Sequence, residues 1–365
     1  MYQRSIGVKA ATDDVARSPG VTVAWINRIG TAVPPHDVHA EFVTFGRTLL
    51  PDERRRAVFD RMAGLADIAH RYSIFAPGPL PRDKSVDAEG FYRRGAFPST
   101  AQRMARFHAP ALDLAQNAVD DLDLGPGERA RITHLIVASC TGFSAPGLDF
   151  RLMRAAGLPD SVERTMIGFM GCFAAVNALR LARHIVRSEP AARVLVVNVE
   201  LCSLHMQEQW ELTKLLSFLL FGDGASAALV TADPEGISLG AFRTEVVART
   251  KELITWDIGD AGFEMHLSGQ VPGQIRRFAR DAGAALLRRL DIRDAAHWAI
   301  HAGGRTILDA VQDGLGLTPD ALRHSRGVLR DFGNMSSATL MFVLARIMAG
   351  RPAPGPASGW RSARA

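Results

Sequence analysis

Residues 165–182 constrain the fold of this chain more than any other stretch. The first half of the stretch is short and apolar and ends in glycines. The second half repeats apolar residues at helical spacing, at Val176, Leu179 and Ala182. This pattern predicts a strand or turn that becomes a helix, with Cys172 where the helix begins.

Cys172 has the sequence surroundings of a nucleophile. Free N–H groups and the dipole at a helix N-terminus stabilise a thiolate and lower its pKa. Gly171 has no side chain, so another molecule can approach the backbone closely beside the thiol. We therefore predict a reactive cysteine with a lowered pKa on an open face. The alternative is a buried structural cysteine, which is a common environment for a free thiol.

Strand patterns and helical patterns alternate around this junction. The strand patterns are nearly continuous apolar runs, and the strongest covers residues 193–200. Such alternation predicts an α/β fold in which a buried sheet is covered by helices on both faces. The predicted strands are 21–29, 131–139, 193–200 and 226–231, and the predicted helices are 38–69 with a break at Pro51, 100–121, 146–157 and 173–187.

A similar pattern restarts near residue 237, which predicts a duplicated, layered α/β architecture. We expect an N-terminal half at 20–235 and a C-terminal half at 236–349. Residues 1–19 are predicted to form a flexible leader, and residues 350–365, rich in Gly, Pro, Ala, Ser and Arg, a disordered tail. In the second half the predicted strands are 237–247 and 297–300, and the predicted helices are 271–290, 305–315, one beginning at 317–319, and 338–349.

Composition narrows the functional classes. The chain is 47% hydrophobic and 22% charged, which fits a soluble globular enzyme, and none of its apolar runs has the length of a membrane span. Its net charge of +5 is scattered, which favours an anionic small ligand over nucleic acid. Three cysteines and an N-terminus without a signal-peptide core indicate a reducing, cytoplasmic location. Neither metal-ligand spacing nor a phosphate-binding glycine loop is present, so no metal or cofactor is predicted.

Reactive polar residues recur where predicted elements end or begin. Cys140, Cys202 and His301 follow apolar strands, whereas Cys172 and Asn334 stand at helix starts. Functional sites of α/β sheets gather at such ends, so a cysteine, a histidine and an asparagine could converge as nucleophile, base and amide donor. The imidazole would hold the thiolate as an ion pair and, with the amide, stabilise an enolate or oxyanion.

These residues also have structural interpretations. His301 could be a packed core histidine, and Asn334 could only cap the helix that follows it. Cys140 and Cys202 could line a pocket as small hydrophobic residues. Asp223, which lies between two glycines, could be only a turn residue.

A basic patch lies in the predicted helical region before residue 69. It is either a solvated helix face or a site that captures a phosphorylated ligand. The patch consists of Arg54, Arg55, Arg56 and Arg61.

Four motifs, in this order along the chain, resemble those of type III polyketide synthases, the chalcone synthase-like enzymes of the thiolase fold. The similarity extends from about residue 22 to residue 350 and is closest in pattern to bacterial alkylpyrone and alkylresorcinol synthases. The motifs are Gly171-Cys172-Phe173-Ala174, Leu220-Phe221-Gly222-Asp223-Gly224-Ala225, His301-Ala302-Gly303-Gly304 and Gly333-Asn334-Met335-Ser336-Ser337-Ala338.

The resemblance implies roles for individual residues. Cys172 would carry the acyl chain, with His301 and Asn334 polarising the malonyl thioester as it loses carbon dioxide. Phe221 is similar to the aromatic gatekeeper between the CoA tunnel and the cavity, and Met265 stands at the second gatekeeper position. The other implied residues are Cys140, Thr141 and Cys202 at the cavity, and Arg61, Arg54, Arg55, Arg56, Gly303 and Gly304 at the CoA site, where two family lysines are absent.

The resemblance also implies a thiolase-like fold, a homodimer and iterative condensation of an acyl-CoA starter with malonyl-CoA, without a cofactor. Small residues at the cavity would open an acyl tunnel, so we expect a medium-to-long acyl starter and an alkylpyrone or alkylresorcinol product. Two alternatives remain open. One is a ketoacyl-ACP synthase III, which shares the Cys/His/Asn triad, and the other is a non-catalytic acyl-CoA-binding protein.

The sequence departs from the family pattern in three places. Ala302 replaces a proline, which would leave the loop after His301 less rigid. Ala145-Pro146 replaces the Met-Pro of the family's dimer contact. After Gly350 the chain lacks the Gly-Phe-Gly-Pro-Gly loop between two strands that walls the family's cavity, so we expect the last strands of the thiolase fold to be missing and the cavity to be open to water.

Overall fold

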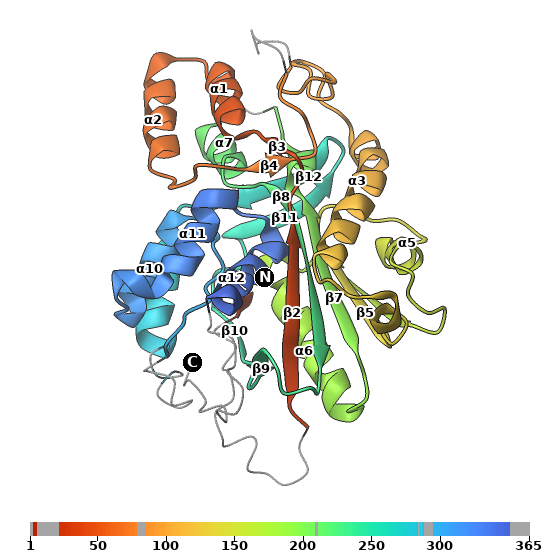
Figure 1. Cartoon of the computed structure of the whole chain (residues 1–365). Coiled ribbons are helices and arrows are strands. Elements are labelled where there is room, and N and C mark those ends of the chain that lie inside the picture. The colour runs from red at the N-terminus through yellow and green to blue at the C-terminus, as the bar shows by residue number, and fades with distance from the viewer. Residues whose placement is uncertain are drawn as a thin grey trace.

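The computed structural model describes residues 3–5, 22–78, 85–208, 211–283, 285, 287 and 295–350. Its centre is a six-stranded mixed sheet with the strand order β6-β5-β7-β8-β2-β9 (Figure 1). β5 pairs in parallel with β6 and β7, whereas the β7–β8, β8–β2 and β2–β9 pairs are antiparallel. The strands are β2 (Ala24–Ala32), β5 (His134–Ser139), β6 (Glu163–Gly168), β7 (Val194–Leu201), β8 (Asp223–Thr231) and β9 (Ile237–Leu239).

Helices cover both faces of this sheet, as the sequence predicts. Every residue of β7 is buried, and its side chains alternate between two cores. Leu195 and Val197 pack in the core that contains residues of α3 and α5, whereas Val194 and Val196 pack in the core that contains residues of α6 and α12. The helices are α3 (Thr100–Asp120), α5 (Leu148–Ala155), α6 (Ala174–Ser188) and α12 (Thr339–Ala349).

The junction predicted at Cys172 forms. β6 ends at Gly168, a short 3-10 helix η1 (Gly171–Phe173) follows, and α6 begins at Ala174. Gly171 has a φ of +70°, which a residue with a side chain rarely adopts. A Cβ atom on it would meet nothing within 4 Å, so the space beside Cys172 is open.

The second half differs from the prediction because it forms no large sheet of its own among residues 237–283 and 295–350. The predicted strand at 297–300 is wrong: this segment has no ladder partner in the described chain, and an extended segment without a partner is not a strand. The predicted strand at 237–247 is two strands, since β9 joins the central sheet and β10 (Thr244–Val246) pairs with β1 (Gln3–Ser5) in the predicted leader. The rest of the leader, and the tail from residue 351, lie outside the described residues.

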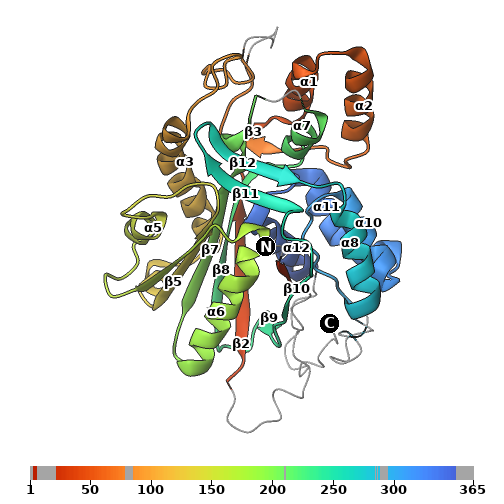
Figure 2. The same ribbon diagram turned by 180° about the vertical axis from the view of Figure 1, so that it is seen from behind.

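The remaining elements of the second half are one hairpin and several helices. The hairpin of β11 (Ile254–Gly259) and β12 (Gly262–Leu267) extends from the sheet toward α8 and α10 (Figure 2). The predicted helix at 271–290 is α-helical over Val271–Phe278 and π-helical over Ala279–Gly283, and part of its remainder lies outside the described residues. The helices are α8 (Val271–Phe278), a π-helical turn η3 (Ala279–Gly283), α10 (Arg305–Leu315), η4 (Pro319–Leu322), α11 (Arg323–Phe332) and η5 (Ser336–Ala338).

A small helical subdomain covers one end of the molecule (Figure 1). The predicted helical region with a break near Pro51 forms two helices, and Asp52 caps the second by accepting from the Arg55 N–H at 2.8 Å. No helix in the described ranges is long and apolar enough to cross a membrane. The elements at this end are β3 (His36–Asp37), α1 (His39–Leu49), α2 (Glu53–Gly64), β4 (Tyr72–Ser73) and α7 (Leu212–Phe218). Two short elements lie elsewhere along the chain: α4 (Pro126–Arg129) after α3, and η2 (Cys202–His205) after β7.

Candidate active site

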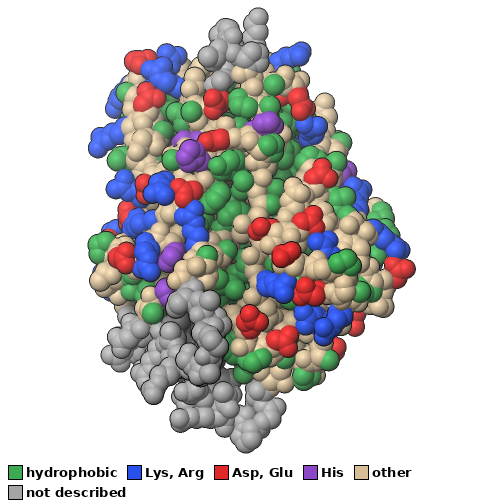
Figure 3. All heavy atoms as spheres, in the orientation of Figure 1, with side chains coloured by type: hydrophobic (Ala, Val, Ile, Leu, Met, Phe, Trp, Pro, Cys, Tyr) green, Lys and Arg blue, Asp and Glu red, His purple; other side chains and the backbone are tan. Residues whose placement is uncertain are grey.

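A cavity of about 1060 Å³ lies between the two halves of the chain. It receives Cys172 from the first half and His301 and Asn334 from the second. Hydrophobic side chains gather along the middle of one molecular face, between flanks with more charged residues (Figure 3). The three predicted catalytic residues, which lie far apart in the sequence, therefore line one largely apolar cavity.

The environment of Cys172 differs from the sequence prediction in its electrostatics. Burial raises the pKa of the thiol to about 11. A hydrogen bond with the Ser336 side chain and one with the Asn334 side chain lower this pKa, and the Glu200 carboxylate raises it, so the sum stays above the ordinary value. The thiol pKa is therefore raised where the sequence predicts a lowering, because desolvation outweighs the hydrogen bonds that lower it.

His301 is also neutral at pH 7. Burial lowers the pKa of its imidazole to about 4. Its Nδ1 atom is buried without a hydrogen-bond partner, and in the described chain no hydrogen bond joins the ring to Cys172. The predicted thiolate–imidazolium ion pair is not formed, so the resting pair is a neutral thiol and a neutral imidazole.

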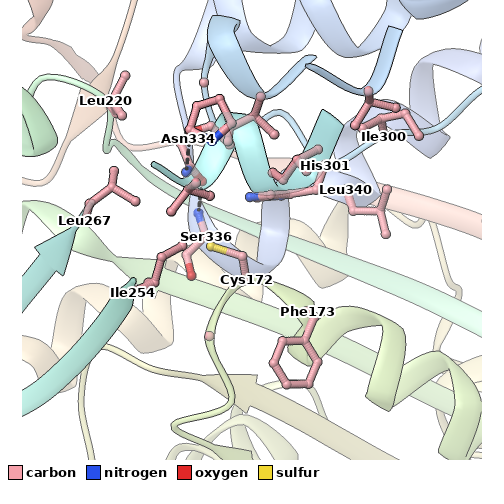
Figure 4. Close-up of a pocket in the computed structure, with 18 of the residues that line it drawn as sticks. Cys172, Phe173, Leu220, Ile254, Leu267, Ile300, His301, Asn334, Ser336 and Leu340 are labelled. Atoms are coloured by element: carbon pink, nitrogen blue, oxygen red, sulfur yellow. Dashed lines mark hydrogen bonds between the residues drawn. The ribbon is translucent and has the colours of Figure 1, made fainter. Parts of the chain in front are cut away.

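Asn334 links the histidine loop to the turn before α12. Its Nδ2 donates to the Gly303 carbonyl at 3.3 Å, and its Oδ1 accepts from the Ser336 N–H at 2.9 Å. The side chain therefore bonds to the turn before α12 and also lines the cavity, while its catalytic role stays a prediction. Figure 4 shows the Asn334 side chain and a ring nitrogen of His301 directed toward the space near the Cys172 thiol.

Two glycine motifs fit together to hold Asn334 in place. Phe221 and Asn334 form a parallel β-bridge, and the Gly222 N–H donates to the Asn334 carbonyl at 3.0 Å. A Cβ atom on Gly222 would lie 3.0 Å from the Phe332 carbonyl oxygen, and one on Gly224 would lie 2.4 Å from the Met335 sulfur. A side chain at position 222 would therefore press on backbone, whereas one at position 224 would displace the Met335 side chain.

A buried carboxylate under the cavity was not identified from the sequence. Glu200 is the last residue but one of β7, and its Oε2 accepts from the Cys140 N–H and from the Thr141 hydroxyl, each at 3.0 Å. Its Oε1 accepts from the Ser337 hydroxyl at 2.5 Å. Burial raises the pKa of Glu200 to about 7. The sequence signal for Glu200 is its position at the end of the strongest predicted strand, two residues before Cys202.

A buried arginine was missed for a different reason. Arg71 donates from Nη1 to the Phe218 carbonyl at 2.8 Å and to the Phe221 carbonyl at 2.6 Å. A Cβ atom on Gly333 would lie 2.8 Å from its Cγ, so its stem packs beneath the Asn334 turn. Burial lowers the pKa of Arg71 to about 10, and the nearby Asp223 raises it. Neither local spacing nor a motif indicates this contact, because its partners are more than a hundred residues away.

Most of the other predicted residues line the cavity or belong to the basic patch near its mouth. Phe221, Met265, Cys140, Thr141, Cys202, Gly303 and Gly304 line the cavity. The basic patch lies on α2, whose last turn and following residues line the cavity mouth through Met62, Ala63, Leu65 and Ala66. Asp223 is buried rather than a simple turn residue, and its carboxylate accepts from the Ser203 N–H at 2.8 Å and the Ser203 hydroxyl at 2.6 Å.

The described residues contain no group of three or more His, Cys, Asp or Glu side chains placed to hold a metal ion. The reactive groups that line the cavity include a thiol, an imidazole and a carboxamide. A thiol can carry an acyl group as a thioester, and neutral N–H donors can stabilise negative charge on a carbonyl oxygen.

A mixed sheet between helices, with a cysteine at the start of a buried helix, is the arrangement of thiolase-like acyl-condensing enzymes. Comparison with protein families narrows this class. Residues 12–234 match chalcone and stilbene synthases, N-terminal domain, and residues 239–352 match chalcone and stilbene synthases, C-terminal domain. The chain therefore belongs to the chalcone and stilbene synthase family, the type III polyketide synthases, as its motifs predict.

Solved structures agree with this assignment. PKS-I from the brown alga Ectocarpus siliculosus has a TM-score of 0.81 at 29% identity, over 91% of this chain and 91% of that chain. The C-terminal type III polyketide synthase domain of Steely1, a type I/III hybrid from Dictyostelium, has a TM-score of 0.79 at 24% identity, over 91% and 93%. A mutant of CsyB complexed with CoA-SH has a TM-score of 0.74 at 23% identity, over 89% and 92%. These likenesses confirm the predicted thiolase-like fold class, and the two family matches confirm an acyltransferase-type condensing enzyme.

Proposed function

We propose that this enzyme loads an acyl group from CoA onto Cys172 and extends it by repeated decarboxylative condensation with malonyl-CoA. The observation that carries the proposal is the meeting of Cys172, His301 and Asn334 in one apolar cavity. Water-poor surroundings strengthen every electrostatic interaction with a developing oxyanion. The cavity size supports a chain that is extended more than once before release.

In the loading step His301 accepts the thiol proton while the sulfur of Cys172 attacks the thioester carbonyl. The new C–S bond forms, the bond to the CoA sulfur breaks, and the CoA thiolate leaves with the proton that His301 returns. A neutral imidazole with a pKa of about 4 is available as a base throughout the neutral range. The raised thiol pKa makes this concerted proton transfer necessary, because little free thiolate exists at pH 7.

In the condensation step malonyl-CoA loses carbon dioxide and leaves an enolate. The Asn334 N–H stabilises the enolate oxygen, and so does the His301 N–H in the tautomer whose proton is on the nitrogen that faces the cavity. The enolate carbon attacks the acyl thioester on Cys172, which releases the thiolate and leaves a β-keto chain on CoA. Asn334 suits this role because its Nδ2 already points to the Gly303 carbonyl beside His301 and its Oδ1 is occupied by the Ser336 N–H.

We further propose a medium-to-long acyl-CoA starter and an alkylpyrone or alkylresorcinol product. The small side chains of Cys140, Thr141 and Cys202 at the cavity wall support an extended acyl chain. Gly303 and Gly304 would lie beside the pantetheine arm, with Phe221 and Met265 as gatekeepers and the basic residues Arg54, Arg55, Arg56 and Arg61 near the CoA phosphates. A cytoplasmic homodimer belongs to the same proposal.

The test is mass spectrometry of products from a panel of acyl-CoA starters incubated with malonyl-CoA. We expect pyrone or resorcinol products from medium-to-long acyl starters, and no acyl-enzyme in a Cys172→Ala variant. Products from aromatic starters alone, or from malonyl-CoA alone, would contradict the proposed medium-to-long acyl starter.

The same assay separates the two alternative functions. Condensation with malonyl-ACP but not with malonyl-CoA would indicate a ketoacyl-ACP synthase III. No release of labelled carbon dioxide from malonyl-CoA, despite an intact Cys172, would indicate a binding protein instead of an enzyme. His301→Ala and Asn334→Ala serve as matched variants, since each removes one proposed oxyanion donor and leaves the thiol in place.

A further inference from the structure

Helix α2 exposes apolar and basic side chains on one face, which we name the α2 stripe: Arg54, Val58, Arg61, Met62 and Leu65. Val58 is 42% exposed, Met62 44% and Leu65 47%, which are high values for large apolar residues. They recur at helical spacing, so their side chains form one continuous line along the helix. A continuous exposed apolar line is typical of an interaction surface, whereas single exposed residues are not.

The two arginines of the α2 stripe have no acidic partner among the described residues. The acidic side chains nearest to them in sequence are engaged elsewhere, because Arg47 on α1 pairs with Glu53 at 2.7 Å and with Asp60 at 3.0 Å. Arg54 and Arg61 occur in none of the ion pairs of the described chain. The α2 stripe therefore presents uncompensated positive charge beside apolar surface.

The α2 stripe ends at the mouth of the cavity. Met62 and Leu65 belong both to the stripe and to the cavity lining. Arg305, at the start of α10, donates from Nη1 to the Leu65 carbonyl at 3.2 Å. This bond ties the two sides of the mouth together, so a partner held on the stripe would lie beside a fixed entrance.

We propose that the α2 stripe docks an acidic, helical acyl carrier protein, which delivers the starter acyl group as a pantetheine thioester. This inference rests on the proposed function, since the carrier replaces only CoA in the loading step. The bond from the acyl carbon to the pantetheine sulfur breaks as the bond to Cys172 forms, and the pantetheine thiol leaves with the proton. Atoms and electrons balance without another reactant.

Size and charge favour such a carrier. A helix of 12 residues is about 18 Å long, which matches one helix of a small partner protein. Acidic residues on that helix would pair with Arg54 and Arg61, and apolar residues would cover Val58 and Met62. Contacts of this size are typical of transient complexes, which a carrier that must leave after each transfer requires.

A membrane surface fits the α2 stripe less well. Helices that lie in a bilayer interface need a wide apolar face, usually with Trp, Phe or Leu. On α2 the apolar line is one residue wide and Arg61 interrupts it. Glu53 and Asp60 remain 71% and 45% exposed on the same helix, and an anionic bilayer would repel them.

The first test measures binding without chemistry. The fluorescently labelled acyl carrier protein of a bacterial fatty-acid synthase is titrated with the full chain, and its anisotropy gives the dissociation constant. We expect saturable binding that Val58→Glu and Arg54→Glu/Arg61→Glu each weaken by about tenfold or more, because they place acidic groups against an acidic partner.

Arg277→Glu is the control for a single reversal of charge. Arg277 lies on α8, apart from α2, and occurs in no ion pair of the described chain (Figure 2). Its binding should match that of the parent chain.

The second test measures transfer of the acyl group to Cys172 by intact-protein mass spectrometry. Decanoyl carrier protein should load the chain at least about tenfold faster than decanoyl-pantetheine, and Val58→Glu should remove this advantage while loading from decanoyl-pantetheine stays within about twofold. No binding, or binding that the α2 variants leave unchanged, would overturn the docking surface even if decanoyl-CoA loads normally. Binding to anionic phospholipid vesicles that the α2 variants abolish, with carrier binding absent, would also overturn it. Carrier binding without loading from any thioester would instead contradict the proposed function and leave the docking surface supported.

Discussion

The two halves of the molecule hold their parts of the site in different ways. Cys172 follows a strand of the six-stranded sheet and begins α6, which packs against that sheet. His301 follows residues 295–300, which are paired into no sheet of the described chain and none of which is fully buried. The segment is held by side-chain packing, since Trp298, Ala299 and Ile300 lie against small apolar clusters, and by individual bonds such as that from the Ile300 N–H to the Ser325 hydroxyl at 3.1 Å. The nucleophile therefore follows a strand of the large sheet, whereas the base follows a segment outside any described sheet.

Hydrogen exchange should show this contrast most strongly. The amides of β7 are buried in a doubly covered sheet and exchange only on global unfolding, whereas the amides of 297–301 exchange through local opening. We expect a difference in protection on the order of 10³ or more, measured by mass spectrometry of peptides from the native protein. Equal protection of the two segments would show that the second half is as tightly closed as the first.

Two matched core substitutions give the next largest effect. Leu195 and Leu308 are both fully buried, but Leu195 belongs to the large core under α3 and Leu308 to a small cluster beside the cavity. Leu195→Ala should lower the free energy of unfolding by about 4 kcal/mol and Leu308→Ala by about 2 kcal/mol, because the smaller cluster can relax around the lost atoms. Urea unfolding measures both values. Losses of the same size would mean that the two halves are packed equally well.

The sequence was sufficient for those parts of the fold whose partners are close in the chain or whose patterns are strong. The strands around residues 134–139 and 194–201 and the helix from Ala174 followed from apolar spacing, because a fully buried strand needs apolar residues on both faces. The segment 297–300 shows the limit, since it has the composition of a strand but a strand exists only where a neighbour pairs with it.

The candidate site shows a similar division. Cys172, His301 and Asn334 stand in motifs and could be named in advance, but the protonation states of the first two could not. The pKa of a thiol depends on how deeply the fold buries it, and here burial outweighs the hydrogen bonds with Ser336 and Asn334 that lower the pKa. Arg71 and Glu200 were missed because their importance comes from partners that only the tertiary structure brings close.

Arg71 connects the two halves and offers a smaller, more specific test. Its guanidinium holds the carbonyls of Phe218 and Phe221, and its stem packs against Gly333. Arg71→Lys keeps the charge opposite Asp223 but loses the planar fork, so we expect a loss of about 1.5 kcal/mol in the free energy of unfolding. We also expect a broader distribution of product lengths, because the Phe221 turn is less constrained.

Product analysis by liquid chromatography and mass spectrometry, together with urea unfolding, separates the two effects of Arg71→Lys. Ile136→Val is the control: it should lower the free energy of unfolding by about 1 kcal/mol, and the buried cluster of Ile136 contains no residue of the Phe221 turn. An unchanged product distribution in Arg71→Lys would show that the arginine stabilises the fold without positioning the gate.

The smallest effect, a factor of ten for each pH unit, tests how the two halves meet at the thiol. With a thiol pKa of about 11, roughly one molecule in ten thousand carries the thiolate at pH 7, and this fraction rises tenfold per unit until the pH approaches the pKa. Alkylation by iodoacetamide needs the thiolate and no base, so its rate at Cys172 should rise about tenfold per unit between pH 6 and 9. A thiolate held by a protonated His301 would instead react at a rate that is fast and nearly constant over this range.

His301→Ala is the matched variant. If the imidazole is neutral, with a pKa of about 4, this variant should leave the alkylation profile unchanged. If the ion pair exists, the variant should abolish fast alkylation near pH 6. A constant rate in the parent chain that His301→Ala removes would therefore contradict the neutral resting pair. It would mean that His301, from the second half, already holds Cys172 as a thiolate before substrate binds.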